Sequence, residues 1–208
     1  MRQPIEFQNS LRYRLAGWWD TPGDGAWPAV VLAHDSGSDR DNPDDAAVVE
    51  LLLARGIAAL RFDFTGCGES QGEAQDVIPA QLTDDLLWAL EYAIRRPECT
   101  GSVGIYGTGS GGRAAIQVAI ESSILAAVVL RHPVVNGLYR YAGIITSPTL
   151  ILETVTVPAA SQRLFDALEC TRKQVLLPAD GGGYAAAEAA DWFAEHFAEV
   201  REVLASQP

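Results

Sequence analysis

The segment with the clearest chemical potential is 106–112, which reads YGTGSGG. It follows the apolar run VGI and precedes RAAIQVAI, whose composition suits a helix. A glycine-rich turn between a strand and a helix can hold a catalytic nucleophile on a tight bend, or it can bind a phosphate with its backbone N–H groups. The residues around the turn must therefore decide whether it serves covalent catalysis or phosphate binding.

The elements that would position this turn alternate along the chain. Short apolar runs predict buried strands, and they lie at 28–33, 57–63, 103–106, 125–130, 149–153 and 173–178. Helical patterns separate them, at 42–56, 79–96, 110–121, 161–169 and 185–204. In the first helix Asn42 can serve as the N-cap and Pro43 suits the first turn. Strands alternating with helices predict one α/β domain over residues 1–208, with functional groups at the carboxyl ends of the strands.

Composition limits the classes of function. The 208 residues are 48% apolar and 20% charged, as in a soluble globular domain. Cys67, Cys99 and Cys170 are far apart and lack CxxC spacing, which argues against a zinc site or a disulfide scaffold and favours the cytoplasm. A net charge of −12 disfavours nucleic acid as a partner. We also expect no membrane contact, because no apolar run approaches the ~20 residues of a span and the first ten residues lack a signal-peptide core.

Five segments, taken in order, resemble the α/β-hydrolase family, in particular its small members similar to dienelactone hydrolase. They are VVLAHDSGSDRD, ARGIAALRFDFTGCGESQGE, SVGIYGTGSGGRAAI, SPTLILE and KQVLLPAD. In that family these correspond, in order, to the strand and oxyanion loop, the next strand with its GxGxS turn, the nucleophile strand with its elbow and helix, the strand before the acid, and the strand before the histidine. The resemblance covers nearly the whole chain. It implies a mostly parallel sheet of about eight strands, the second antiparallel, with helices on both faces and no lid domain.

The family's reaction uses a serine on a G-x-S-x-G elbow, a histidine base and an orienting acid. When YGTGSGG is placed on that elbow, Gly109 falls at the nucleophile position. The expected acid position falls near Thr156, and no Asp occurs between Asp85 and Asp166. The expected histidine position falls near Gly182. The resemblance therefore predicts a hydrolase fold whose catalytic triad has been lost.

Loss of the nucleophile would leave the turn intact. Elbow nucleophiles have positive φ angles, which glycine adopts freely, so Gly109 would preserve the backbone while removing the reactive group. The backbone N–H of Ser110, with that of Asp35 or Ser36 across the cleft, could still form an oxyanion-type pocket. We expect a non-catalytic protein, monomeric or homodimeric, that binds a small anionic or acyl-like ligand there or contacts a protein partner. Glycines that merely permit close packing are an equally good interpretation.

A shifted nucleophile is the first alternative. Small residues stand two positions before and two positions after Ser110. His132 and Glu153 lie at the ends of two predicted strands, so Ser110, His132 and Glu153 could form a serine hydrolase for esters or thioesters. Ser110 is also suited to a plain structural role in the first turn of a helix. Of the other histidines, His34 is predicted to be structural, and His196 is predicted to be a packing or surface residue.

Dinucleotide binding is the second alternative. Gly107, Gly109 and Gly112 spell G-x-G-x-x-G between a strand and a helix. The acidic residue of that motif is missing, and Arg131 stands at the end of the next strand, where it could suit a 2′-phosphate. Because the flanking segments follow the hydrolase order, we expect no cofactor and no metal.

Overall fold

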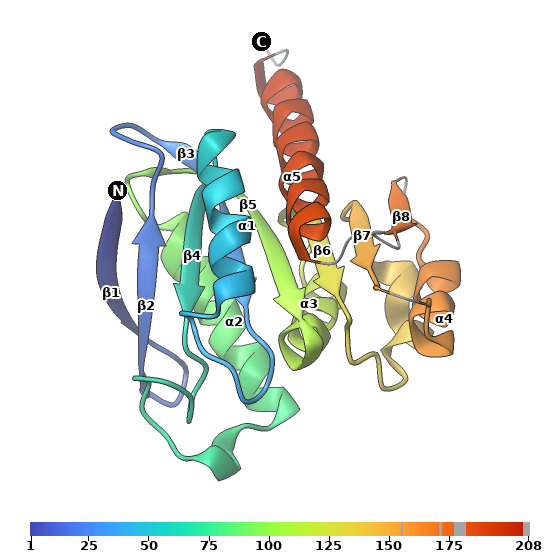
Figure 1. Cartoon of the computed structure of the whole chain (residues 1–208), viewed down its shortest axis with the longest axis horizontal. Helices are drawn as coiled ribbons and strands as arrows, with labels where there is room; N and C mark the ends of the chain where they lie inside the picture. Colours follow the sequence, from blue (N-terminus) through green and yellow to red (C-terminus); the bar gives the residue numbers. More distant parts are fainter. Residues whose placement is uncertain (155, 171, 177–181, 206–208) are drawn as a thin grey trace.

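A mostly parallel sheet organises the molecule (Figure 1). The computed structural model describes residues 1–154, 156–170, 172–176 and 182–205. The strands are β1 (Arg2–Gln8), β2 (Arg14–Asp20), β3 (Trp27–Ala33), β4 (Ala58–Phe62), β5 (Cys99–Thr108), β6 (Leu125–Arg131), β7 (Thr149–Leu152) and β8 (Lys173–Leu176). The helices are α1 (Pro43–Ala54), α2 (Pro79–Ile94), α3 (Gly109–Glu121), α4 (Ala159–Ala167) and α5 (Gly182–Ala205), with short 3₁₀ helices η1 (Ala74–Asp76) and η2 (Leu138–Ile144).

The eight strands follow the order β1-β2-β4-β3-β5-β6-β7-β8. Strand β2 is antiparallel to both of its neighbours, β1 and β4, and the remaining pairs are parallel. The predicted sheet, including its antiparallel second strand, is therefore confirmed. Strand β8 begins at the predicted residue, and positions 177–178 of that prediction lie outside the described residues.

Two apolar layers bury the sheet. One layer packs the residues of α2 and α3 against one face, and the other packs α1 and α5 against the opposite face. Figure 1 shows α1 and α5 in front of the strands and α2 behind them. The six residues of β3 after Trp27 are all buried, as a parallel strand covered on both faces requires. Helices on both faces were predicted, and this is confirmed.

Local signals explain where the first helix begins. The side chain of Asn42 accepts a hydrogen bond of 2.8 Å from the backbone N–H of Asp44, and Pro43 occupies the first turn. This is the predicted cap, which satisfies a backbone donor that the helix cannot satisfy itself. The short helix η2 between β6 and β7 was not predicted. It lies in the connection between β6 and β7, whose residues are all described, and no larger inserted domain stands there.

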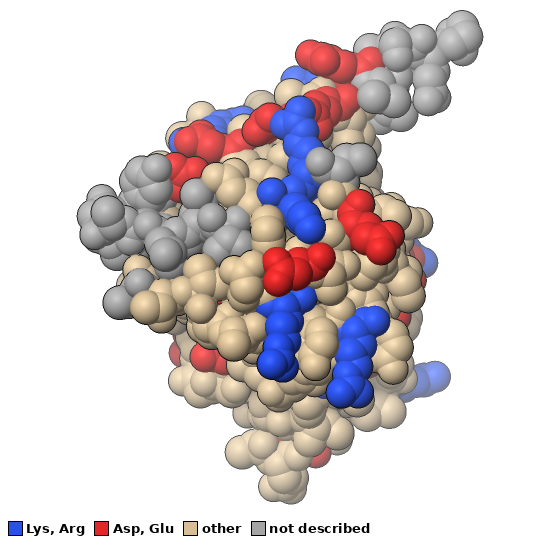
Figure 2. Space-filling model, turned by 90° about the vertical axis from the view of Figure 1, so that its right-hand side faces the viewer, with Lys and Arg blue, Asp and Glu red and all other residues tan. Residues whose placement is uncertain are grey.

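Positive and negative side chains are mixed on one face of the molecule. Figure 2 shows basic and acidic side chains next to one another on the face at the β8 side of the sheet. Arg172 forms ion pairs there with Glu195 and, at 2.7 Å, with Glu199, both from α5. Among the described helices, none combines the length and the apolar composition needed to cross a bilayer.

The sheet topology brings four strand ends to one edge. Strands β3, β5, β6 and β7 are consecutive neighbours and parallel. His34 follows β3, Gly109 follows β5, His132 follows β6 and Glu153 follows β7. Residues separated by more than a hundred positions in the sequence therefore share the carboxyl edge of the sheet, where α/β proteins usually place their sites.

Candidate functional site

The turn between β5 and α3 has the geometry of an elbow. Gly109 is the first residue of α3, directly after the strand, and its φ angle is +53°. A Cβ on Gly111 would lie 2.2 Å from the carbonyl oxygen of Ala33, so this glycine permits α3 to approach β3 closely. The turn thus requires glycine at Gly111 for space and favours it at Gly109 for conformation.

The side chain of Asp35 occupies the space next to Gly109. A Cβ on Gly109 would lie 2.2 Å from both Cγ and Oδ1 of Asp35. Asp35 follows His34 in the loop after β3, so its carboxylate reaches across the cleft to the start of α3. A side chain at position 109 and the present position of this carboxylate exclude one another.

One oxygen of Asp35 accepts hydrogen bonds from the backbone N–H groups that were predicted to form an oxyanion-type pocket. Its Oδ1 accepts hydrogen bonds from the backbone N–H of Ser110 at 2.8 Å and from that of Ser36 at 2.7 Å. The Ser110 hydroxyl donates to the same oxygen at 3.0 Å. Two backbone N–H groups converging on one oxygen is the arrangement that stabilises an oxyanion. Here that oxygen belongs to the protein itself, and it also caps the N-terminus of α3.

The Ser110 hydroxyl is bonded to Asp35 and Ser36. It accepts from the backbone N–H of Ser36 at 2.7 Å and contacts the Ser36 hydroxyl at 2.9 Å, in addition to its bond to Asp35. Within the part of the chain that the structure describes, no hydrogen bond joins Ser110 to an imidazole. A serine nucleophile needs such a bond to a base, although the bond often tightens only when substrate is present.

His132 and Glu153 do form a pair. Nδ1 of His132 lies 2.8 Å from Oε2 of Glu153. Glu153 is 3% exposed, and the Ser161 hydroxyl donates to its other oxygen at 2.5 Å. Such a bond makes Nδ1 the donor and leaves Nε2 free to accept a proton. His132 also has a φ of +47°, an uncommon value for a residue with a side chain.

The histidine-bearing loop runs beside the elbow. The backbone N–H of Val134 donates to the carbonyl of Gly109 at 3.0 Å. A Cβ on Gly112 would lie 3.2 Å from Pro133, which shows how closely the loop packs on the turn. Of the alternative set, the structure therefore joins His132 to Glu153 and places Ser110 on the adjacent element without bonding it to either.

The other predicted positions offer no acid or base. Thr156 is exposed in a bend beyond β7, whereas Glu153 stands immediately at the end of that strand. Gly182 is the first residue of α5, and the segment 177–181 before it lies outside the described residues.

His34, which follows β3, is buried. Its Nε2 accepts from the backbone N–H of Phe64 at 3.2 Å and its Nδ1 donates to the carbonyl of Asp35 at 2.8 Å. Burial lowers the pKa of His34, and its predicted structural role is confirmed.

Arg131, which the dinucleotide alternative would direct to a phosphate, is engaged elsewhere. Its guanidinium forms an ion pair of 2.9 Å with Asp44 in the first turn of α1. The described residues also contain no group of three His, Cys, Asp or Glu side chains that could hold a metal ion.

A pocket of about 570 Å³ adjoins the elbow network. Ser36 contributes to it from one side, and the turn containing Cys67 and Gly68 contributes from the other. Burial raises the pKa of the Cys67 thiol, so this sulfur stays protonated at neutral pH and is a poor nucleophile. The pocket is large enough for a small organic molecule.

The strand order, the elbow and the shared carboxyl edge define an α/β-hydrolase-fold protein. The chain belongs to the family described as X-Pro dipeptidyl-peptidase (S15 family), whose model matches residues 15–203. The predicted membership of the α/β-hydrolase superfamily, with similarity to dienelactone hydrolase, is therefore confirmed.

Solved structures of similar fold include two enzymes. An esterase from Pyrococcus furiosus superposes with a TM-score of 0.82 at 18% identity, covering 96% of this chain and 92% of that one. A dienelactone hydrolase from Anabaena variabilis gives 0.77 at 26% identity, covering 93% and 98%. The similarity to the esterase shows the fold alone.

Curated relatives match only part of this chain. The quorum-quenching protein AidA of Acinetobacter baumannii is 33% identical over 117 residues, which are 54% of this chain and 37% of that protein. An uncharacterized 31.7 kDa protein of Escherichia coli is 30% identical over 112 residues, or 53% and 38%. The chain thus spans well under half the length of these relatives.

Proposed function

We propose that this protein does not use the Ser-Asp-His chemistry of its fold and instead binds a small ligand at the carboxyl edge of its sheet. The observation that carries the proposal is the position of Asp35. Its carboxylate takes the space that a side chain on Gly109 would need and accepts from both N–H groups of the oxyanion-type pocket. A protein that hydrolyses esters through this elbow would need that space and those donors free.

The pocket beside Ser36 is the proposed ligand site. An uncharged acyl-like compound fits it better than an anion, because the carboxylate of Asp35 would repel a second negative charge nearby. Esters and lactones belong to this class, and the name of one structural neighbour, a dienelactone hydrolase, supports it. An anion, or a protein that presents a carboxylate, would have to displace Asp35 from its donors.

Serine hydrolysis through Ser110 is a second candidate, favoured by one specific observation. The 2.8 Å bond between His132 and Glu153 is the base-orienting half of a catalytic triad. For this candidate, Ser110 must exchange its bonds to Asp35 and Ser36 for a bond to Nε2 of His132. Ester or thioester substrates would then be attacked at the carbonyl carbon.

A fluorophosphonate probe separates the two candidates. The reagent phosphonylates activated serines, and intact mass spectrometry detects the adduct. We expect no adduct on the folded wild-type protein and the same result for Ser110→Ala. Stoichiometric labelling that disappears in Ser110→Ala and in His132→Ala would contradict the proposal and establish the second candidate.

Ligand binding needs its own measurement. Ethyl butyrate is a suitable neutral acyl probe for ligand-observed NMR. Ala74 lines the pocket and Ala80 lies outside it, and both are exposed. We expect ethyl butyrate to bind the wild-type protein and Ala80→Trp, and to bind Ala74→Trp at least several-fold more weakly because the indole fills the pocket. Equal binding to the two variants, or none to the wild type, would remove this pocket as the ligand site.

A further inference from the structure

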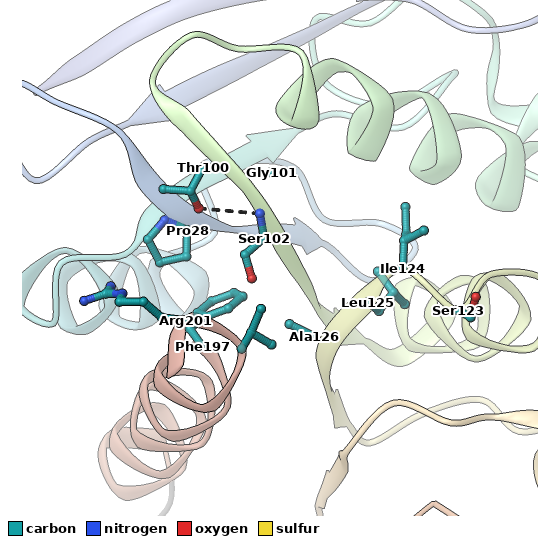
Figure 3. A pocket seen from close by; sticks show the side chains of 11 residues that line it. Pro28, Thr100, Gly101, Ser102, Ser123, Ile124, Leu125, Ala126, Phe197 and Arg201 are labelled. Atoms are coloured by element: carbon teal, nitrogen blue, oxygen red, sulfur yellow. Dashed lines mark hydrogen bonds between the residues drawn. The ribbon is translucent and has the colours of Figure 1, made fainter. Parts of the chain in front are cut away.

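We propose that the opposite edge of the sheet carries a second binding site, for a small neutral alcohol with an apolar body. Two pockets of about 470 and 380 Å³ lie where β5 and β6 begin, beneath the C-terminal half of α5. They share Ser123, Leu125, Ala126 and Val200 as lining residues. We call these two adjoining pockets the α5 groove. Figure 3 shows the larger one, with Ser102 of β5 opposite Phe197 of α5.

A buried histidine without a full set of partners points to the ligand. His196 lines the smaller pocket and is 1% exposed. Its Nδ1 lies 2.7 Å from the carbonyl oxygen of Trp192, which can only accept, so Nδ1 carries the proton. In the neutral ring Nε2 is then an acceptor, and it has no hydrogen-bond partner among the described residues. This nitrogen calls for a donor such as a hydroxyl group.

Two serine hydroxyls at the α5 groove also lack hydrogen-bond partners among the described residues. Ser147 lines the smaller pocket beside His196 and is 2% exposed, and its Oγ lacks a partner within the described chain. Ser102 lines the larger pocket, and its Oγ is likewise buried and unpaired among those residues. Figure 3 shows this hydroxyl directed into the space between β5 and α5. A hydroxyl can donate and accept, so a ligand OH suits an acceptor such as Nε2 of His196 and a hydroxyl such as that of Ser147.

The remaining lining favours an uncharged molecule. Leu125, Ala126, Val200 and Phe197 supply apolar surface, which suits the body of the ligand. Charges of both signs stand at the groove, Arg201 in the larger pocket and Glu199 in the smaller. Glu199 is already paired with Arg172. The three polar atoms described above are a ring nitrogen and two hydroxyls, which can bond to a neutral hydroxyl without any charge on the ligand.

The α5 groove is separate from the elbow. Ser102 and Gly109 stand near opposite ends of β5, about 20 Å apart along the strand. The proposal therefore does not depend on the proposed function at the carboxyl edge, and either can fail alone.

Phenol and toluene provide the test, because they differ by a hydroxyl in place of a methyl group of similar size. Dissociation constants are measured by NMR titration of the full chain. We expect phenol to bind about fivefold or more tightly than toluene, since only phenol can donate to His196. His196→Phe should abolish this preference, and Tyr141→Phe, which removes an exposed hydroxyl outside the groove, should retain it.

Three outcomes would overturn the proposal: no phenol binding, equal binding of the two compounds, or a preference that survives in His196→Phe. If His196→Phe does not fold, Ala126→Leu replaces it, because the larger side chain projects into both pockets. Phenol binding should then fall at least fivefold. Binding that is unchanged in Ala126→Leu would refute the site.

Discussion

Returning a serine to the elbow should destabilise this protein. In Gly109→Ser the new Cβ would lie 2.2 Å from Asp35, a distance at which one group must move. The φ of +53° adds strain for any residue with a side chain, about 1–2 kcal/mol, and turning the Asp35 carboxylate away from its three donors adds about 1–3 kcal/mol. We expect the free energy of unfolding to fall by about 2–5 kcal/mol. Gly23→Ser is the control, because a Cβ there meets nothing within 4 Å.

The second step removes the obstacle. Asp35→Ala deletes the acceptor of three hydrogen bonds and should cost about 1–3 kcal/mol by itself. In the double variant the serine no longer meets a carboxylate, so the loss should be smaller than the sum of the single losses by about 1–3 kcal/mol. Urea unfolding of the four proteins, followed by circular dichroism, measures this coupling. Additive losses, or a Gly109→Ser protein as stable as Gly23→Ser, would refute the reasoning.

Two further predictions concern buried charges. Burial raises the pKa of Asp45 to about 6, so between about pH 4 and 6 the folded state holds a proton that the unfolded state has released. Wild-type stability should therefore fall relative to Asp45→Asn as pH rises through this window, by about 3 kcal/mol; urea unfolding at pH 4 and pH 7 tests this, and a difference that does not change with pH would contradict it. Arg40 pairs with Asp63 at 3.1 Å, and both are buried. Arg40→Met should lower the free energy of unfolding by about 3–5 kcal/mol, because the buried carboxylate of Asp63 then keeps two backbone donors but loses its counter-ion. Glu69→Gln, which removes the charge of the exposed partner of Arg40, should change it far less, and a similar loss in both variants would show that the buried pair is not the cause.

The fold followed from the sequence because its elements carry strong periodic signals. A run such as PAVVLA can be buried on both faces only as a parallel strand or within a core helix, and its length favours the strand. The cap at Asn42 was predictable because it depends on residues next to one another. Helix η2 was not predictable in this way, since LYRYAGI shows no clear period and its 3₁₀ form depends on its neighbours.

The site was predictable only in part. Glycine spacing identified the elbow, because α3 can approach Ala33 closely only if position 111 has no side chain. The juxtaposition of His132 and Glu153 followed from adjacent strand ends, and the structure shows the bond. The reach of Asp35 to Gly109 was missed. It joins residues 74 positions apart and depends on the direction of one side chain, which no periodic pattern encodes. An aspartate directly after the oxyanion-loop strand was the available signal.

Ester hydrolysis tests the central claim most directly. The rate of p-nitrophenyl butyrate hydrolysis is compared between the wild-type protein, Ser110→Ala and His132→Ala at equal concentration. Our account predicts the same low rate for all three, because neither side chain takes part in acyl transfer. A wild-type rate well above those of both variants would contradict it, and would show that Ser110 leaves Asp35 to act with His132 as nucleophile and base.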